Sequence, residues 1–119
     1  LNICIVDDEE DILNLVETVI KEISEDLNIL RANNADKALE IIAKNKIHTL
    51  ITDISMPNMN GNDMIAKIYT EQKKIPKNII IVSAYIDIDD PKASENLYFF
   101  QKPIDLEIFK ETIKKCIEQ

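Results

Sequence analysis

The chain has 119 residues, a length typical of one domain. Its 22 acidic residues outnumber its 14 basic ones and give a formal net charge of −8, which argues against non-specific nucleic-acid binding by this domain. There is no apolar stretch of the roughly 20 residues that cross a membrane and no signal-peptide pattern at the N-terminus, so we expect a cytoplasmic protein without a membrane segment. Cys4 and Cys116 lie in apolar patterns without metal-ligand spacing, which predicts free core thiols and no disulfide.

The first third of the chain alternates between short apolar runs and amphipathic helical patterns. Residues 2–6 predict a strand that ends in the acidic run 7–11. A helix should follow, because apolar residues recur at helical spacing in Ile12, Leu15, Val16, Val19, Ile20 and Ile23. Residues 27–32 predict a second strand. Asn33 and Asn34 can cap a second helix whose inward face is formed by Ala35, Ala38, Leu39 and Ile42.

The middle of the chain contains two further apolar runs. Residues 47–52 predict a buried strand that delivers Asp53 to its carboxyl end, followed by a loop with Pro57 and Gly61. Asn60 can cap a third helix that ends before Pro76, with Met64, Ile65 and Ile68 facing inward. Residues 78–84 are almost wholly apolar, as expected of a strand covered on both faces, and this run includes the hydroxyl of Ser83.

The last third of the chain completes the alternation. Residues 85–95 are acidic, contain Pro91 and show little apolar periodicity, so they predict only a short, weak helix. Residues 97–100 predict a fifth strand, and Asp105 can cap a last helix with the stripe Leu106, Phe109, Ile113, Cys116 and Ile117. Strand and helix thus alternate five times, which predicts an α/β fold with a parallel sheet, right-handed crossovers and helices on both faces.

Parallel strands end at the same edge of a sheet, so five polar residues should meet there: Asp7, Asp8, Asp53, Ser83 and Lys102. Converging carboxylates repel one another unless a cation intervenes. Oxygen ligands with open positions favour Mg²⁺, with Mn²⁺ or Ca²⁺ as alternatives. A divalent ion, an ammonium and a hydroxyl around a carboxylate nucleophile predict phosphoryl transfer onto Asp53. His48, the only histidine, lies at the entry of its strand, so we interpret it as structural.

Each of these residues also has a purely structural interpretation. Acidic residues at a helix start favour the helix dipole, and an Asp at a strand end often stabilises a turn. Ser83 and Lys102, taken singly, are typical of solvated loops. Their coincidence at successive strand ends favours the functional interpretation.

Four segments resemble, in order and approximate spacing, the response-regulator receiver domain of two-component signalling. They are Asp7-Asp8, Asp53-Ile54-Ser55-Met56-Pro57-Asn58-Met59-Asn60-Gly61, Ser83-Ala84 and Lys102-Pro103. The resemblance covers essentially the whole chain, so residues 1–119 are expected to form one receiver domain. It implies a doubly wound, flavodoxin-like (βα)5 fold with a five-stranded parallel sheet in the strand order 2-1-3-4-5.

The resemblance also implies residue roles. Asp53 would be the phosphoacceptor, taking a phosphoryl group from a phosphohistidine on a sensor histidine kinase or phosphotransfer protein. Asp8, Asp53 and the backbone carbonyl of Ser55 would ligate Mg²⁺, with Asp7 acting through water. Lys102 would pair with phosphate or with Asp53, and the Lys102-Pro103 bond would be cis.

The expected switch involves Ser83, which would bond the phosphoryl oxygen, and Phe99, which occupies the place of an aromatic residue that is often Tyr in this family. Such a domain is a signalling module, not a conventional enzyme, and catalyses only its own phosphorylation and dephosphorylation, at rates influenced by Ser55 and Tyr85. Its partners would be the phosphodonor and an output domain or effector protein. A homodimer would use the face formed by residues 85–95, the fifth strand and the last helix.

The sequence departs from the family pattern near that face. The interval from Ser83 to Lys102 is shorter than expected, and Glu95-Asn96 replaces a common Gly-Ala pair. Three other functions compete with the main one. A haloacid-dehalogenase-like phosphatase would need a second Asp where Glu9 stands. A flavodoxin-like nucleotide or flavin carrier would need a Gly-rich loop, yet Gly61 is the only glycine. A phosphorylation-independent docking domain would not need the intact acidic pair, acceptor and Lys102.

Overall fold

The computed structural model describes residues 1–53, 61–72, 74–84 and 96–118. Within them, five strands form one parallel sheet in the order β2-β1-β3-β4-β5. The strands are β1 (Asn2–Val6), β2 (Asn28–Ala32), β3 (Thr49–Asp53), β4 (Asn78–Ser83) and β5 (Leu97–Gln101). This arrangement confirms the predicted fold class and strand order.

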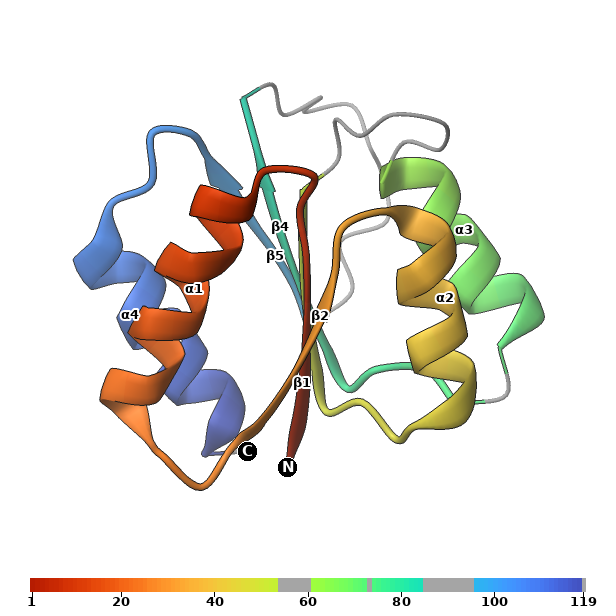
Figure 1. Ribbon diagram of the computed structural model, residues 1–119, viewed down its shortest axis with the longest axis horizontal. Helices are drawn as coiled ribbons and strands as arrows, with labels where there is room; N and C mark the ends of the chain where they lie inside the picture. The colour runs from red at the N-terminus through yellow and green to blue at the C-terminus, as the bar shows by residue number, and fades with distance from the viewer. Residues whose placement is uncertain (54–60, 73, 85–95, 119) are drawn as a thin grey trace.

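Among the described residues, four helices cover the two faces of the sheet: α1 (Glu10–Ile23), α2 (Ala35–Lys44), α3 (Gly61–Glu71) and α4 (Leu106–Ile117). Figure 1 shows α1 and α4 on one face and α2 and α3 on the other. The helix predicted within residues 85–95 and the cap predicted at position 60 lie outside the described residues. No helix in the described part of the chain has the length and apolar character needed to cross a membrane.

Two helix starts confirm the predicted capping residues. The Asn34 side chain accepts a hydrogen bond from the Lys37 backbone N–H at 2.8 Å. The Asp105 carboxylate accepts hydrogen bonds from the backbone N–H groups of Glu107 and Ile108, at 3.1 and 3.3 Å. These bonds satisfy donors that a helix leaves unpaired in its first turn, and they fix where α2 and α4 begin.

Two separate hydrophobic clusters hold the helices to the sheet. One combines residues of β1, β3 and β4 with α2 and α3, and the other combines the opposite faces of these strands with α1 and α4. Strand β4 is buried along its whole length, as its apolar sequence predicts. Cys4 belongs to the first cluster and Cys116 to the second, and both thiols are free, as predicted. Burial raises the pKa of Cys4 to about 12 and also raises that of Cys116.

Two residues predicted to face inward are exposed. Leu15 is 38% exposed, whereas Leu13, which the predicted stripe left out, is buried. Successive helix residues are about 100° apart, so a stripe centred near Leu13, Val16 and Ile20 leaves Leu15 at its edge. Leu106 is 44% exposed because it is the first residue of α4. Helical side chains lean toward the N-terminus, so a first-turn side chain extends past the start of its helix.

All five strands end at the edge of the sheet shown at the top of Figure 1. The register pairs Val6 of β1 with Thr52 of β3, Asp53 of β3 with Val82 of β4, and Ser83 of β4 with Gln101 of β5. The residues that follow these strands therefore begin their loops at nearly the same height. The topology brings together residues that are far apart in the sequence.

The inner face of α4 should contribute far more to stability than its outer face. Phe109 is fully buried, and its ring packs edge-on against that of Phe100, with centroids 5.5 Å apart and planes at 84°. We expect Phe109→Ala to lower the free energy of unfolding by about 3–5 kcal/mol in urea titrations. The neighbouring Ile108 is more than half exposed, so Ile108→Ala should cost under about 1 kcal/mol. Equal losses in the two variants would contradict the packing described.

Candidate functional site

Three carboxylates meet at the carboxyl edge of the sheet. Asp7 directly follows β1, Asp8 is the next residue, and Asp53 ends β3. A ligand oxygen from each lies within 4.8 Å of the others. Asp7 is only 3% and Asp53 only 6% exposed, whereas Asp8 is open to solvent. The group therefore has a buried base and one accessible side.

Lys102 places a positive charge against the two buried carboxylates. Its Nζ lies 3.3 Å from Asp53 Oδ2 and 3.6 Å from Asp7 Oδ2. Its backbone N–H donates to the Ser83 carbonyl at 2.8 Å, which fixes the residue after β5 to the end of β4. The Lys102-Pro103 peptide bond is cis, as the sequence resemblance implied. The ammonium thus bridges two carboxylates that would otherwise repel each other.

Burial and charge act against each other at this site. Burial raises the pKa of the Asp7 carboxyl from 3.8 to about 6. The Glu9 N–H and Lys102 oppose this rise in pKa, while the charges of Asp53 and Asp8 add to it. Burial alone would lower the pKa of Lys102, but its neighbours Asp7 and Asp53 outweigh that effect and raise it. Lys102 is therefore held in its charged form.

Sequence reasoning missed two hydrogen bonds between side chains and backbone at this site, one to the Asp7 carboxylate and one to the Asp53 backbone. The Glu9 N–H donates to Asp7 Oδ1 at 2.9 Å and closes the turn between β1 and α1. The buried Thr52 hydroxyl donates to the Asp53 carbonyl oxygen at 2.9 Å. The acidic run around Glu9 predicted charge but not this turn, and a Thr within a strand pattern gives no indication of its partner.

The remaining predicted site residues differ in what the structure describes of them. Ser83 ends β4 at the same edge and is buried. Phe99 lies on β5, paired with Ile81 and packed against the cluster on the α2 and α3 side. Ser55 lies outside the described residues. His48 lies just before β3, at the opposite end of the strand from Asp53, where its Nδ1 contacts Thr49 Oγ1 at 2.8 Å. That position agrees with its predicted exclusion from the site.

The carboxylate group fits a hard divalent cation. Three ionised carboxylates and one ammonium leave two negative charges, which a divalent ion would neutralise. Oxygen-only ligands and an accessible side are typical of Mg²⁺ sites, because that ion keeps several of its waters and takes few carboxylates. Asp8 and Asp53, with Asp7 beside them, are the described residues that could hold it.

The family of this chain follows from a match over nearly its whole length. The protein-family model for the response regulator receiver domain matches residues 3–114, so the chain belongs to that family. It is a receiver domain of a two-component response regulator. Receiver domains bind Mg²⁺ at an acidic cluster and act as signalling modules that interact with histidine kinases and output domains.

The similar proteins include both short and long response regulators. The sporulation initiation phosphotransferase F of Bacillus subtilis (strain 168) is 28% identical over 118 residues, which cover 97% of this chain and 92% of that protein. A CheY homologue from Campylobacter jejuni is 28% identical over 98% of this chain and 92% of its own length. The transcriptional regulatory protein GlrR of Escherichia coli (strain K12) is 26% identical over 99% of this chain. This chain spans only 26% of GlrR.

Solved structures agree with the fold. The receiver domain of a DNA-binding response regulator from Colwellia psychrerythraea 34H superimposes with a TM-score of 0.85 over 100% of this chain and 99% of that one, at 19% identity. The response regulator TrrA of Thermotoga maritima, solved in complex with Mg²⁺-BeF, has a TM-score of 0.78 and 28% identity over 97% of each chain.

The raised pKa of Asp7 makes the metal-free protein sensitive to pH. Because its folded-state value of about 6 exceeds the ordinary 3.8, the folded protein holds this proton more tightly than the unfolded chain. That stabilisation is complete below about pH 4 and is lost as pH rises through about 6. Asp7→Asn should therefore be more stable than the parent by about 1–3 kcal/mol at pH 7.5, and the difference should vanish near pH 4.

The measurement is urea unfolding across this pH range with EDTA present. Glu111→Gln, which removes an exposed carboxylate from α4, serves as the control and should change stability little at either pH. A destabilised Asp7→Asn at pH 7.5 would show that the ionised Asp7 is favourable in the fold.

Proposed function

We propose that residues 1–119 form a Mg²⁺-dependent phosphoacceptor domain whose acceptor is Asp53. The observation that carries this proposal is the environment of that carboxylate. Asp53 ends a central strand, and its Oδ2 lies 3.3 Å from Lys102 Nζ. Ligand oxygens of Asp53, Asp7 and Asp8 lie within 4.8 Å of one another. A carboxylate beside an ammonium and a cation site is suited to attack phosphorus and to offset the charge of the incoming group.

The donor is a phosphohistidine on a sensor histidine kinase or a phosphotransfer protein. A carboxylate oxygen of Asp53 forms a bond to phosphorus as the P–N bond breaks, and the electron pair of that bond stays on the imidazole nitrogen. The product is an acyl phosphate on Asp53. Attack of water on its phosphorus releases inorganic phosphate and regenerates the carboxylate, so the only reactions the domain catalyses are its own phosphorylation and dephosphorylation.

The site residues have separate roles in this proposal. Asp8 and Asp53 would ligate Mg²⁺ directly and Asp7 would act through a water. The backbone carbonyl of Ser55, a residue outside the described part of the chain, would complete the protein ligands. The bound ion would neutralise charge on the phosphoryl oxygens. Lys102 already lies against Asp53 and would pair with the phosphoryl group once it is attached. The Mg²⁺-BeF complex of the TrrA relative and the phosphotransferase name of the Bacillus subtilis relative support these roles.

The phosphorylated state is read out through Ser83 and Phe99. Ser83 ends the strand next to β3, and Phe99 lies on the following strand, packed against the core. A bond from the Ser83 hydroxyl to a phosphoryl oxygen would favour a second arrangement of this region, and an output domain or effector protein would bind that arrangement. The longer GlrR relative is a transcriptional regulatory protein, which supports an attached output domain as one form of that partner.

Phosphorylation should depend on Asp53. We expect acetyl phosphate plus Mg²⁺ to add one phosphate to the parent chain, measured by intact-mass spectrometry, and none to Asp53→Asn. EDTA should abolish the addition, because the ion offsets the charge of the attacking carboxylate and the phosphoryl oxygens. Asp63→Asn changes an exposed carboxylate on α3 and should label like the parent.

The same samples separate the competing functions. Labelling that survives Asp53→Asn would overturn the proposed acceptor. Steady turnover of p-nitrophenyl phosphate would favour a haloacid-dehalogenase-like phosphatase. No phosphate on the parent chain, from acetyl phosphate or from a phosphorylated histidine kinase, would favour a docking domain that acts without phosphorylation.

The switch should require the Ser83 hydroxyl. We expect beryllium fluoride with Mg²⁺ to shift the NMR amide signals of β5 around Phe99 in the parent chain, and these shifts should be at least halved in Ser83→Ala. Thr18→Ala removes an exposed hydroxyl from α1 and should leave the shifts intact. Full β5 shifts in Ser83→Ala, at saturating beryllium fluoride, would rule out this hydroxyl as the link.

A further inference from the structure

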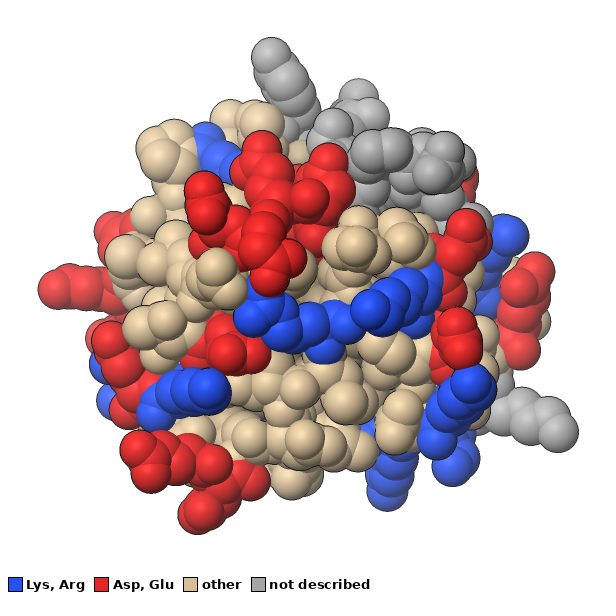
Figure 2. Space-filling model, in the orientation of Figure 1, with Lys and Arg blue, Asp and Glu red and all other residues tan. Residues whose placement is uncertain are grey.

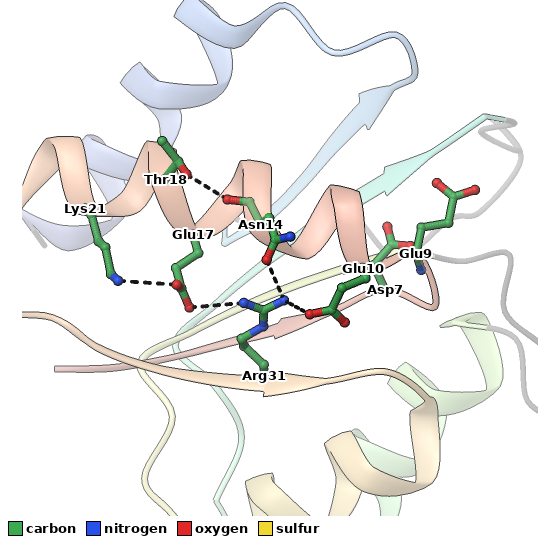
Figure 3. Close-up of polar contacts among 8 residues, drawn as sticks. All are labelled: Asp7, Glu9, Glu10, Asn14, Glu17, Thr18, Lys21 and Arg31. Carbon is green, nitrogen blue, oxygen red and sulfur yellow. Dashed lines mark hydrogen bonds and ion pairs between the residues drawn. The ribbon is translucent and has the colours of Figure 1, made fainter.

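Arg31 is the only arginine among the 14 basic residues of the chain, and it joins the edge strand β2 to helix α1. Its Nη2 donates to Glu10 Oε1 at 2.5 Å and to Asn14 Oδ1 at 3.0 Å, and its Nη1 lies 3.7 Å from Glu17 Oε1. Figure 3 shows the guanidinium between these three side chains. One planar cation thus contacts two successive turns of α1.

The geometry indicates more than an isolated ion pair. An isolated exposed pair contributes little to stability, typically under about 1 kcal/mol. Here 29% of the Arg31 side chain and 24% of the Glu17 side chain are exposed, whereas Glu10 is 72% exposed. The planar guanidinium contacts these two carboxylates and Asn14 at the same time. Glu17 Oε2 in turn lies 3.3 Å from Lys21 Nζ. The contacts therefore restrict where the first half of α1 can lie relative to β2.

The start of α1 needs such a restraint. Glu9 is the N-cap residue, yet its side chain makes no capping hydrogen bond. The helix also begins within five consecutive acidic residues, 7–11, whose charges repel one another. Among the described contacts, two cations contact this acidic run. Lys102 contacts Asp7 on the inner side of the run, which faces the carboxylate group, and Arg31 contacts Glu10 on the outer side, which faces β2.

Asp8 lies between these two points. The inner side is fixed by Asp7, which accepts from the Glu9 N–H and contacts Lys102. The outer side is fixed by the contact of Glu10 with Arg31. Figure 3 shows Glu10 directed toward Arg31, away from the Asp7 side of the turn. Asp8 is the exposed member of the carboxylate group, so its position depends on the turn that carries it.

We infer that Arg31 is a positioning residue for the metal site: by holding Glu10 and the first turn of α1 against β2, it orients Asp8 toward Asp7 and Asp53. This inference rests on the proposed function, in which Asp8 ligates Mg²⁺. Arg31 itself contacts neither Asp53 nor Lys102 among the described interactions, so it acts on the affinity for the ion and not on phosphoryl transfer once the ion is bound.

Positioning and simple electrostatics predict opposite results. Arg31 carries a positive charge near a site for a cation, so by Coulomb's law its removal should tighten Mg²⁺ binding. If Arg31 instead orients Asp8, its removal should weaken Mg²⁺ binding. Residues that orient metal ligands typically change affinity by about 10–100-fold, and we expect a loss near tenfold because Arg31 acts through the turn.

The experiment measures Mg²⁺ affinity by calorimetry and, separately, the rate of labelling by acetyl phosphate at saturating Mg²⁺. Arg31→Gln should bind Mg²⁺ about tenfold more weakly. The labelling rate at saturation should stay within about twofold, because the groups around Asp53 are unchanged. Arg31→Lys keeps the positive charge but loses the planar guanidinium that contacts several partners at once. If the orientation of the first turn of α1 matters, this variant should also weaken Mg²⁺ binding. Lys37→Gln removes an exposed charge from the first turn of α2, and it controls for charge alone.

Glu10→Gln completes a double-mutant cycle with Arg31→Gln. If the two side chains act as one restraint, the double variant should bind Mg²⁺ about as weakly as Arg31→Gln alone. All variants are compared at a temperature at which urea titrations show them folded. Unchanged or tighter Mg²⁺ binding in Arg31→Gln, or parent-like binding in Arg31→Lys, would overturn the positioning role. Absence of Mg²⁺ binding in the parent chain would instead overturn the proposed function itself.

Discussion

Repulsion among three carboxylates is the constraint that the rest of the structure has to satisfy. Asp7, Asp8 and Asp53 hold ligand oxygens within 4.8 Å of one another, and two of these side chains are nearly excluded from water. Water would ordinarily screen such charges, so the protein has to replace it with fixed partners. Lys102 and the Glu9 N–H are two of those partners.

The acidic and the basic residues come from different strands of the sheet. The central strands β1 and β3 deliver the carboxylates, whereas the cations come from the two edges of the sheet, Lys102 after β5 and Arg31 on β2. These central strands are almost wholly buried, so they hold in place the groups whose spacing matters most. Lys102 reaches the two buried carboxylates from one edge, and Arg31 reaches the start of α1 from the other. The strand order 2-1-3-4-5 therefore organises the charge of the site as well as the core.

The sequence predicted the fold and the convergence of the strand-end residues better than it predicted the contacts that these residues make. The end of a strand can be predicted because an apolar run stops at a polar residue. The parallel arrangement of the strands then places Asp7, Asp53 and Lys102 at one edge of the sheet. Leu15 shows the limit for helices, because apolar spacing alone cannot say which arc of a wide stripe meets the sheet. Arg31 could not be predicted at all. Its partners lie on a helix earlier in the chain, and their alignment depends on how that helix crosses the edge strand.

The two buried cysteines give each layer of the protein its own chemical reporter. Cys4 lies in the cluster between the sheet and the helices α2 and α3, and Cys116 in the cluster beneath α1 and α4. Burial keeps both thiols protonated and enclosed, so an alkylating reagent can reach each one only after its own layer opens. The ratio of the two alkylation rates would therefore distinguish separate opening of one layer from cooperative unfolding of the whole domain.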